Sequence, residues 1–125
     1  MRRDQISHFV DAWIHNWNAR DLDTILSHYS DDIVFHSPKA ATIVGRGRID
    51  GKAALRAYWS AALERIPKLR FTLDHFAWDD TSSELFIVYV AELNDQRTRA
   101  CERVRFSGEH VVDSEGLYGA PLAAG

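Results

Sequence analysis

The sequence predicts an α+β fold, with helices in the first half of the chain and strands in the second. Up to Pro67, apolar residues recur at the period of an amphipathic helix. After Pro67 they alternate with polar residues, which is typical of half-buried strands. Clusters of turn-forming residues then divide the second half into lengths that suit an antiparallel meander.

Length, composition and net charge limit the kinds of protein that this chain can be. The chain has 125 residues, 46% of them hydrophobic, so we expect one domain at residues 1–119 and a tail at 120–125. The net charge is −3 and the lysines and arginines are scattered, which gives no basis for nucleic-acid binding. The single cysteine, Cys101, excludes an internal disulfide and indicates a reducing compartment. Without a signal-peptide core or a membrane-length apolar run, we expect a cytoplasmic location and no membrane partner.

Residues 4–19 are predicted to form the first helix, because a broad apolar stripe runs along them. The stripe consists of Ile6, Phe9, Val10, Trp13, Ile14 and Trp17. His8, Asp11 and His15 lie on the other face at spacings that could share a metal ion. Because no further ligand is apparent, we expect a solvated polar face and no metal.

Residues 21–38 are predicted to form a short helix, an acidic corner and a strand. Asp21 is a suitable N-cap, since its carboxylate can accept from the free amides of the first turn. Helical spacing follows at Leu22, Ile25, Leu26 and Tyr29. The polar residues 30–32 are expected to end the helix, and residues 33–37 have strand composition up to Pro38.

Residues 39–50 are predicted to be an irregular edge strand or a mobile loop over a cavity. A helix is then expected at 52–66, ended by Pro67. Its apolar stripe consists of Leu55, Tyr58, Trp59, Ala62, Leu63 and Ile66. Strands are expected at 69–78, 84–94, 97–107 and 111–118. The first of them would turn Leu69, Phe71, Leu73, His75 and Ala77 inward.

The hairpin turn decides which residues of the two longest strands share a face. A two-residue turn at Asp95 and Gln96 would pair Tyr89 with Glu102 and place Glu102 with Ile87 and Val104. The opposite face would mix aliphatic residues with arginines, which suggests a dimer interface. That face holds Phe86, Val88, Val90, Glu92, Arg99, Cys101, Arg103 and Arg105. A three-residue turn would reverse these assignments.

A spaced set of residues resembles the nuclear transport factor 2-like superfamily, specifically its SnoaL-like and ketosteroid isomerase-like members. The set begins with Trp17, Asn18, Asp21, Asp23, Ile25, Tyr29, Asp31, Asp32, Val34 and Pro38. It continues through residues 51–55, 58–59, 105–106, 108 and 118–119. The resemblance implies a cone in which a curved, mixed or antiparallel sheet wraps around three N-terminal helices and leaves an internal pocket. It also implies a homodimer formed through the outer sheet face, and it indicates no single function.

Three positions of the ketosteroid isomerase pattern carry the expected chemistry. The position of that family's carboxylate base is Ser37 here, and a serine hydroxyl cannot remove a carbon-bound proton without a partner base. The oxyanion-hole tyrosine corresponds to Trp13, whose indole can still donate a hydrogen bond. The oxyanion-hole aspartic acid corresponds to Glu102, so the carboxyl group is retained.

Glu102 is therefore the main candidate for an acid or base, because burial in a cavity would raise its pKa. An ion pair with a nearby arginine is the structural alternative. His75 is a second candidate base if its face is the inward one, and His36 should point away from Ser37. The residues expected to line the pocket are Trp17, Tyr29, Phe35, Tyr58, Trp59, Phe71, Tyr89, Val104 and Tyr118.

These observations favour a cofactor-free enzyme with isomerase, cyclase or hydrolase chemistry. Its substrate would be a small hydrophobic molecule that is cyclic or carries a carbonyl group. In this hypothesis Glu102 is the acid or base, and Trp13, Ser37 and His75 complete the catalytic set. The alternative is a non-catalytic ligand-binding or dimeric interaction domain, which the missing carboxylate at Ser37 supports.

Overall fold

A computed structural model describes residues 1–123, which form four helices and one six-stranded sheet. In chain order the elements are α1 (Arg3–Asn18), α2 (Leu22–Leu26), β1 (Tyr29–His36), α3 (Pro38–Val44), β2 (Arg48–Asp50), α4 (Lys52–Glu64), β3 (Leu69–Asp79), β4 (Glu84–Leu93), β5 (Gln96–Ser107) and β6 (His110–Pro121). The sheet order is β2-β1-β6-β5-β4-β3. Only the β1–β6 pair is parallel within this sheet. The predicted α+β class and four-strand meander are therefore confirmed.

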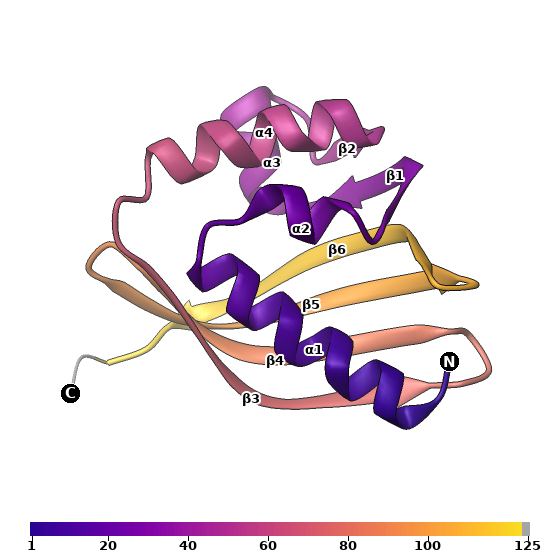
Figure 1. Cartoon of the computed structure of the whole chain (residues 1–125). Coiled ribbons are helices and arrows are strands. Elements are labelled where there is room, and N and C mark those ends of the chain that lie inside the picture. The colour runs from indigo at the N-terminus through magenta and orange to yellow at the C-terminus, as the bar shows by residue number, and fades with distance from the viewer. Residues whose placement is uncertain (124–125) are drawn as a thin grey trace.

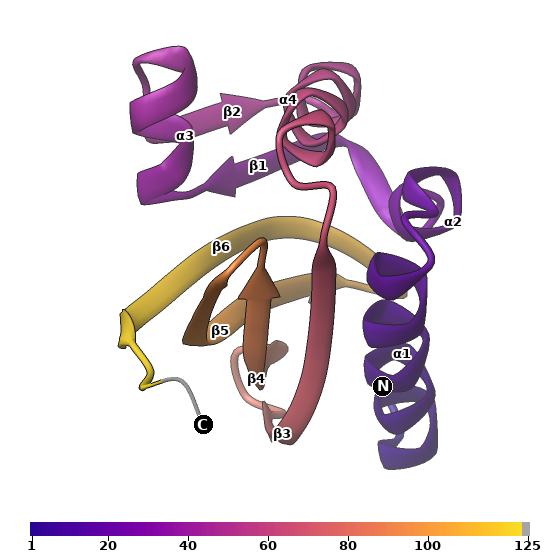
Figure 2. The same ribbon diagram turned by 90° about the vertical axis from the view of Figure 1, so that its left-hand side faces the viewer.

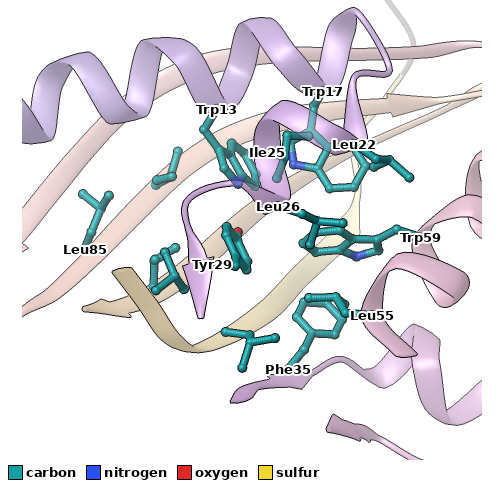
Figure 3. Packing of buried hydrophobic residues seen from close by; sticks show 14 of the residues in the cluster. Trp13, Trp17, Leu22, Ile25, Leu26, Tyr29, Phe35, Leu55, Trp59 and Leu85 are labelled. Atoms are coloured by element: carbon teal, nitrogen blue, oxygen red, sulfur yellow. The ribbon is translucent and has the colours of Figure 1, made fainter. Parts of the chain in front are cut away.

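The sheet is strongly curved and does not close, and the helices lie on its inner side. Figure 1 shows α1 crossing the long strands, while α4 lies above β1 and β2. Figure 2 shows β6 arching between the β1–β2 pair and the other three strands of the meander, β3, β4 and β5. Aromatic side chains fill much of the space beneath the helices (Figure 3). Trp13 stacks on Phe71, and Trp17 meets Trp59 edge-on with ring centroids 4.9 Å apart.

The segment 21–36 follows the predicted sequence of cap, helix and strand, with a different boundary. Asp21 caps α2 by accepting from the Thr24 amide, as expected. The helix ends at Leu26, and residues 30–32 belong to β1 rather than to a corner before it. These polar residues instead lie where the β1–β6 pairing is irregular: its register shifts between Tyr29 and Val34.

The segment predicted as an edge strand or loop contains both the edge strand β2 and the unpredicted helix α3. Ser37 caps α3 by accepting from the Lys39 amide at 3.1 Å, and Pro38 occupies its first turn. Gly45 ends it with φ 79°, in the left-handed region that glycine adopts without strain. A serine-proline start and a glycine end are the sequence signals that indicate this helix.

The β4–β5 hairpin preserves the predicted faces although its turn is shifted. Leu93 pairs with Gln96, so the turn lies at Asn94 and Asp95. Glu102 therefore pairs with Ile87, and Tyr89 pairs with Ala100 rather than with Glu102. Because the loop still has two residues, the alternation is unchanged and Glu102 faces inward.

Two strand predictions are corrected. The register of β3 with β4 shifts between Leu73 and His75, and this bulge reverses the alternation beyond it. Phe76 and Trp78 consequently pack against the core, whereas His75 and Ala77 are exposed. At the other end of the sheet, β6 continues to Pro121, so residues 120 and 121 belong to the strand and not to a tail. The last two residues of the predicted tail, 124 and 125, lie outside the described residues.

Candidate functional site

A cavity of about 170 Å³ lies between the helices and the curved sheet. One water needs about 10–15 Å³ by the same kind of measure, so the space suits a small organic molecule. Its lining is mainly aromatic and aliphatic, with few charged groups. The lining residues are Trp13, Trp17, Phe35, Lys39, Ile43, Tyr58, Trp59, Ala62, Leu63, Arg65, Ile66, Leu69, Phe71, Tyr89, Leu93, Glu102 and Tyr118.

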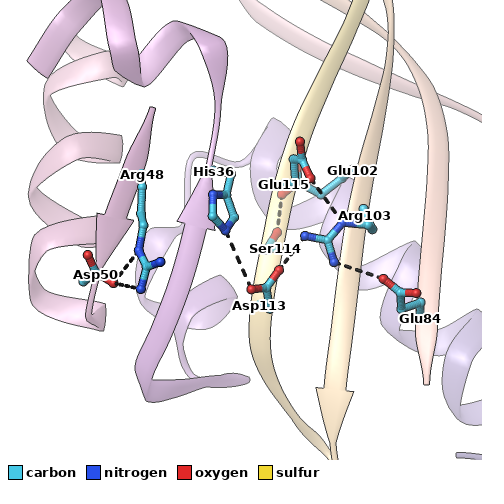
Figure 4. A network of polar contacts seen from close by, with 9 residues as sticks. All are labelled: His36, Arg48, Asp50, Glu84, Glu102, Arg103, Asp113, Ser114 and Glu115. Atoms are coloured by element: carbon cyan, nitrogen blue, oxygen red, sulfur yellow. Dashed lines mark hydrogen bonds and ion pairs between the residues drawn. The ribbon is translucent and has the colours of Figure 1, made fainter. Parts of the chain in front are cut away.

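Glu102 is the acidic residue of this lining, and β5 carries it to the inner face of the sheet. The residue is only 5% exposed. Ser114 on β6 donates its hydroxyl hydrogen to Glu102 Oε2 over 2.5 Å (Figure 4). Burial raises the pKa of Glu102 to about 7, although the Ser114 hydrogen bond and the charge of Arg103 act in the opposite direction. At neutral pH the carboxyl group is therefore present in both protonation states.

The ion-pair alternative for Glu102 does not hold in the described structure. Arg103 points to the outer face, where it binds Glu84, Asp113 and Glu115 (Figure 4). No salt bridge involves Glu102 among residues 1–123, and its hydrogen-bond partner is Ser114. Strand alternation thus separates Glu102 from the neighbouring arginine, as the predicted faces imply.

All four tyrosines of the chain surround Glu102 closely enough to sense its charge. Burial raises the pKa of Tyr29, Tyr58, Tyr89 and Tyr118, and a negative charge on Glu102 raises each pKa further. Their phenols therefore stay protonated at neutral pH and can donate hydrogen bonds. Tyr58, Tyr89 and Tyr118 line the cavity, while Tyr29 lies beneath it in the core.

Gly116 on β6 is a site residue that the sequence analysis missed. A Cβ atom there would lie 3.3 Å from Tyr118 Oη and 3.5 Å from Glu102 Oε1. These two polar atoms thus approach the same point, and the absence of a side chain leaves room for them. A glycine inside a strand pattern is a recognised sign of such a close approach.

Two further polar atoms lie beside this group without a hydrogen bond. Trp13 Nε1 points toward Tyr29 Oη in Figure 3, but neither atom has a hydrogen-bond partner within residues 1–123. Both residues are nearly inaccessible to solvent. Trp13 also lines the cavity, so its indole N–H is a potential donor at the cavity wall.

The structure brings most of the predicted site together but places four predicted catalytic or lining residues elsewhere: Tyr29, Val104, Ser37 and His75. Tyr29 and Val104 are buried in the core rather than at the cavity surface. Ser37 is 3% exposed and caps α3, and it is not part of the described cavity lining. The remaining predicted lining residues do reach the cavity: Trp17, Phe35, Tyr58, Trp59, Phe71, Tyr89 and Tyr118.

Neither histidine candidate reaches the cavity. The His75 side chain is 64% exposed and contacts Asp74 at 3.0 Å on the outer side, because the bulge in β3 reverses its direction. The expectation of an inward His75 is therefore wrong. His36 is not part of the cavity lining and lies 3.8 Å from Asp113 (Figure 4).

Comparison with known proteins assigns the chain to a family. The SnoaL-like domain family matches residues 10–114. The chain belongs to the SnoaL-like family. A SnoaL-like protein of Burkholderia thailandensis E264 is 33% identical, with 95% of this chain and 98% of that chain covered and a TM-score of 0.86. Among curated proteins, none matches the chain significantly.

More distant structures share the fold of this SnoaL-like chain. A ketosteroid isomerase-like protein of Kribbella flavida is 14% identical, with 98% and 83% of the two chains covered and a TM-score of 0.74. TerC, crystallised with polyporic acid, is 13% identical, with 92% of each chain covered and a TM-score of 0.78. Within residues 1–123, no three metal-binding side chains cluster, and no helix has the length and apolar character needed to cross a bilayer.

Proposed function

We propose that this SnoaL-like protein is an enzyme that transfers a proton on a small hydrophobic substrate, cyclic or carbonyl-bearing. The supporting observation is Glu102, a buried carboxyl group whose pKa of about 7 suits both proton uptake and proton release at neutral pH. Because Ser37 occupies the position of the carboxylate base of ketosteroid isomerases, Glu102 alone both removes the proton and returns it.

The proposed step is the enolisation of a carbonyl compound. The Glu102 carboxylate removes a proton from the carbon next to the carbonyl. The electron pair of that C–H bond forms the C=C bond of the enolate, and the π pair of the carbonyl moves to its oxygen. The Tyr118 phenol donates a hydrogen bond to this oxygen, since its Oη and Glu102 Oε1 approach the same point near Gly116. Protonated Glu102 then returns the proton to a carbon of the enolate, which gives an isomerised product.

The aromatic lining supports a flat, ring-shaped substrate, because rings of this kind bury well between Trp17, Trp59 and Phe71. One structural neighbour is described as a ketosteroid isomerase-like protein, and another, TerC, was crystallised with polyporic acid. Both small molecules contain rings. The alternative is a non-catalytic pocket that only holds such a molecule. The capping role of Ser37, where a base would be expected, favours this alternative.

Deuterium exchange separates the two functions without knowledge of the natural substrate. The flat cyclic ketone 2-tetralone is incubated with the protein in D₂O, and loss of the proton signal next to the carbonyl is followed by NMR. We expect the protein to accelerate the exchange. Saturable binding of the ketone without acceleration would instead support the ligand-binding domain.

We also propose that the protein forms a homodimer through the outer face of the sheet. Val88, Cys101 and Leu117 form a row across β4, β5 and β6 on this face, and Leu117 is 43% exposed. Sedimentation velocity should give a dimer for the natural chain and a monomer for Leu117→Arg. The matched control is Val44→Arg, which changes an aliphatic residue on α3 that is 50% exposed and should leave the dimer intact. A monomer at high concentration would contradict this interface.

The cytoplasmic location of the protein stays a prediction.

A further inference from the structure

We propose that the substrate is a flat organic anion whose negative group is bound by Lys39 at the mouth of the cavity. This inference rests on the proposed function of the cavity as a substrate site. It adds the charge of the substrate and the direction in which the substrate enters. Carboxylates and enolates of ring compounds belong to this class.

The charges of the cavity lining support an anion. Lys39 and Arg65 are its two basic residues, and neither has an acidic partner among residues 1–123. Glu102 is the acidic residue of this lining, and it is uncharged whenever it carries its proton. The lining is then positive although the chain as a whole has a net charge of −3. A positive lining around an apolar space attracts and holds organic anions.

The position of Lys39 follows from α3, the helix that the sequence analysis did not predict. Lys39 and Ile43 are one turn apart on this helix, so both reach the cavity from the same face. Lys39 Nζ lies 4.3 Å from the centroid of the Tyr118 ring. The lysine is exposed overall, and its ammonium group is thus held at the edge of the cavity by an aromatic face rather than by a carboxylate.

Tyr118 connects this cation to the proposed reaction point. The face of its ring contacts Lys39, and its Oη lies near the same point as Glu102 Oε1. A ligand that lies along Tyr118 would therefore present its anionic group to Lys39 and its carbonyl group to Glu102.

A bound anion would also offset the free-energy cost of partly burying the charged Lys39 side chain. Partial burial lowers the pKa of this lysine, because it removes water from the ammonium group. A bound carboxylate would restore the charged form by direct attraction and hydrogen bonding. Binding of a neutral molecule of the same shape gives no such compensation.

The test compares 2-naphthoate with 2-naphthamide, which have the same ring system and differ in charge. Their affinities are measured by isothermal titration calorimetry at pH 6, where Glu102 is mainly protonated and the naphthoate is ionised. We expect the natural chain to bind the anion at least about tenfold more tightly than the amide. Lys39→Met should bring this ratio close to one and leave the affinity for the amide unchanged.

Lys68→Met is the matched control, because Lys68 is exposed and lies outside the cavity lining. This variant loses the same charge and should keep the preference for the anion. An equal or stronger affinity for the amide, no binding of either compound, or an unchanged preference in Lys39→Met would each overturn the inference.

The same assay separates this inference from the proposed catalytic role. Glu102→Gln should retain the preference for the anion even though it cannot transfer a proton. A protein that accelerates ketone exchange but shows no preference for naphthoate would keep the catalytic proposal and remove the anionic substrate. A protein that prefers the anion but catalyses no exchange would keep the anionic ligand and remove the catalytic proposal.

Discussion

Replacing Glu102 by glutamine is expected to lower the rate of deuterium exchange of 2-tetralone by about a hundredfold to ten-thousandfold, the usual contribution of a positioned acid or base. Glutamine has the same shape as glutamate, but its amide cannot take up and return a proton at neutral pH. It can still accept the Ser114 hydroxyl through its carbonyl oxygen, so the buried pair is retained. The variant should therefore fold normally and still bind the ketone.

The control for this variant is Glu64→Gln on the exposed side of α4, which should exchange the ketone at the natural rate. Binding of the ketone by each variant is measured separately, so that loss of catalysis is not confused with loss of affinity. Natural exchange rates in Glu102→Gln would remove this residue from the mechanism and would leave the cavity without an identified acid or base.

The stability of the protein is expected to fall with rising pH because of Glu102. Its pKa rises from 4.5 to about 7 on folding, since burial disfavours the charged form. Folding then binds a proton between these values, so the contribution of the group is fully present below pH 4.5. It is lost as the pH rises through 7. The full loss is about 3 kcal/mol of unfolding free energy.

This loss is measured as the difference between the natural chain and Glu102→Gln in urea unfolding at pH 5 and pH 8. The comparison matters because Asp21, Asp50 and Asp74 have lowered pKa values and act in the opposite direction at acid pH. Their effects are common to both proteins and cancel. The variant should gain stability over the natural chain at pH 8. A difference that does not change with pH would show that Glu102 titrates normally.

The inward position of Glu102 could be predicted from the sequence because it depends only on the period of the strands and on a two-residue turn. The turn lies one residue earlier than expected, at Asn94 and Asp95. This moves the pairing partner of Glu102 from Tyr89 to Ile87, and it keeps the same face. Site predictions of this kind are robust to small errors in register as long as the number of loop residues keeps its parity.

The direction of His75 could not be predicted because a single bulge reverses it. The alternation of β3 continues through residues 69–78 in the sequence, and nothing in the spacing marks the extra residue. The aromatic residues Phe76 and Trp78 bury more apolar surface than His75 and Ala77 would, which favours the bulged register. The burial of apolar surface in the folded protein therefore determines which face of β3 points inward, because the local sequence pattern does not distinguish the two faces.

The position of Lys39 was missed for a different reason, because the signals of α3 are present but brief. Ser37, Pro38 and Gly45 are the cap, first-turn proline and terminal glycine of a seven-residue helix. The glycines and arginines that follow suggest a loop. Without the helix, Lys39 and Ile43 have no common face, and the basic edge of the cavity stays hidden.

The most direct test of the central claim is the pKa of Glu102 itself. The carboxyl carbon of selectively ¹³C-labelled glutamate is followed by NMR across the pH range, and its signal is assigned from its absence in Glu102→Gln. We expect a midpoint near 7. A midpoint near 4.5, the ordinary value for glutamate, would contradict both the burial of an uncharged carboxyl group and the proton transfer that we assign to it.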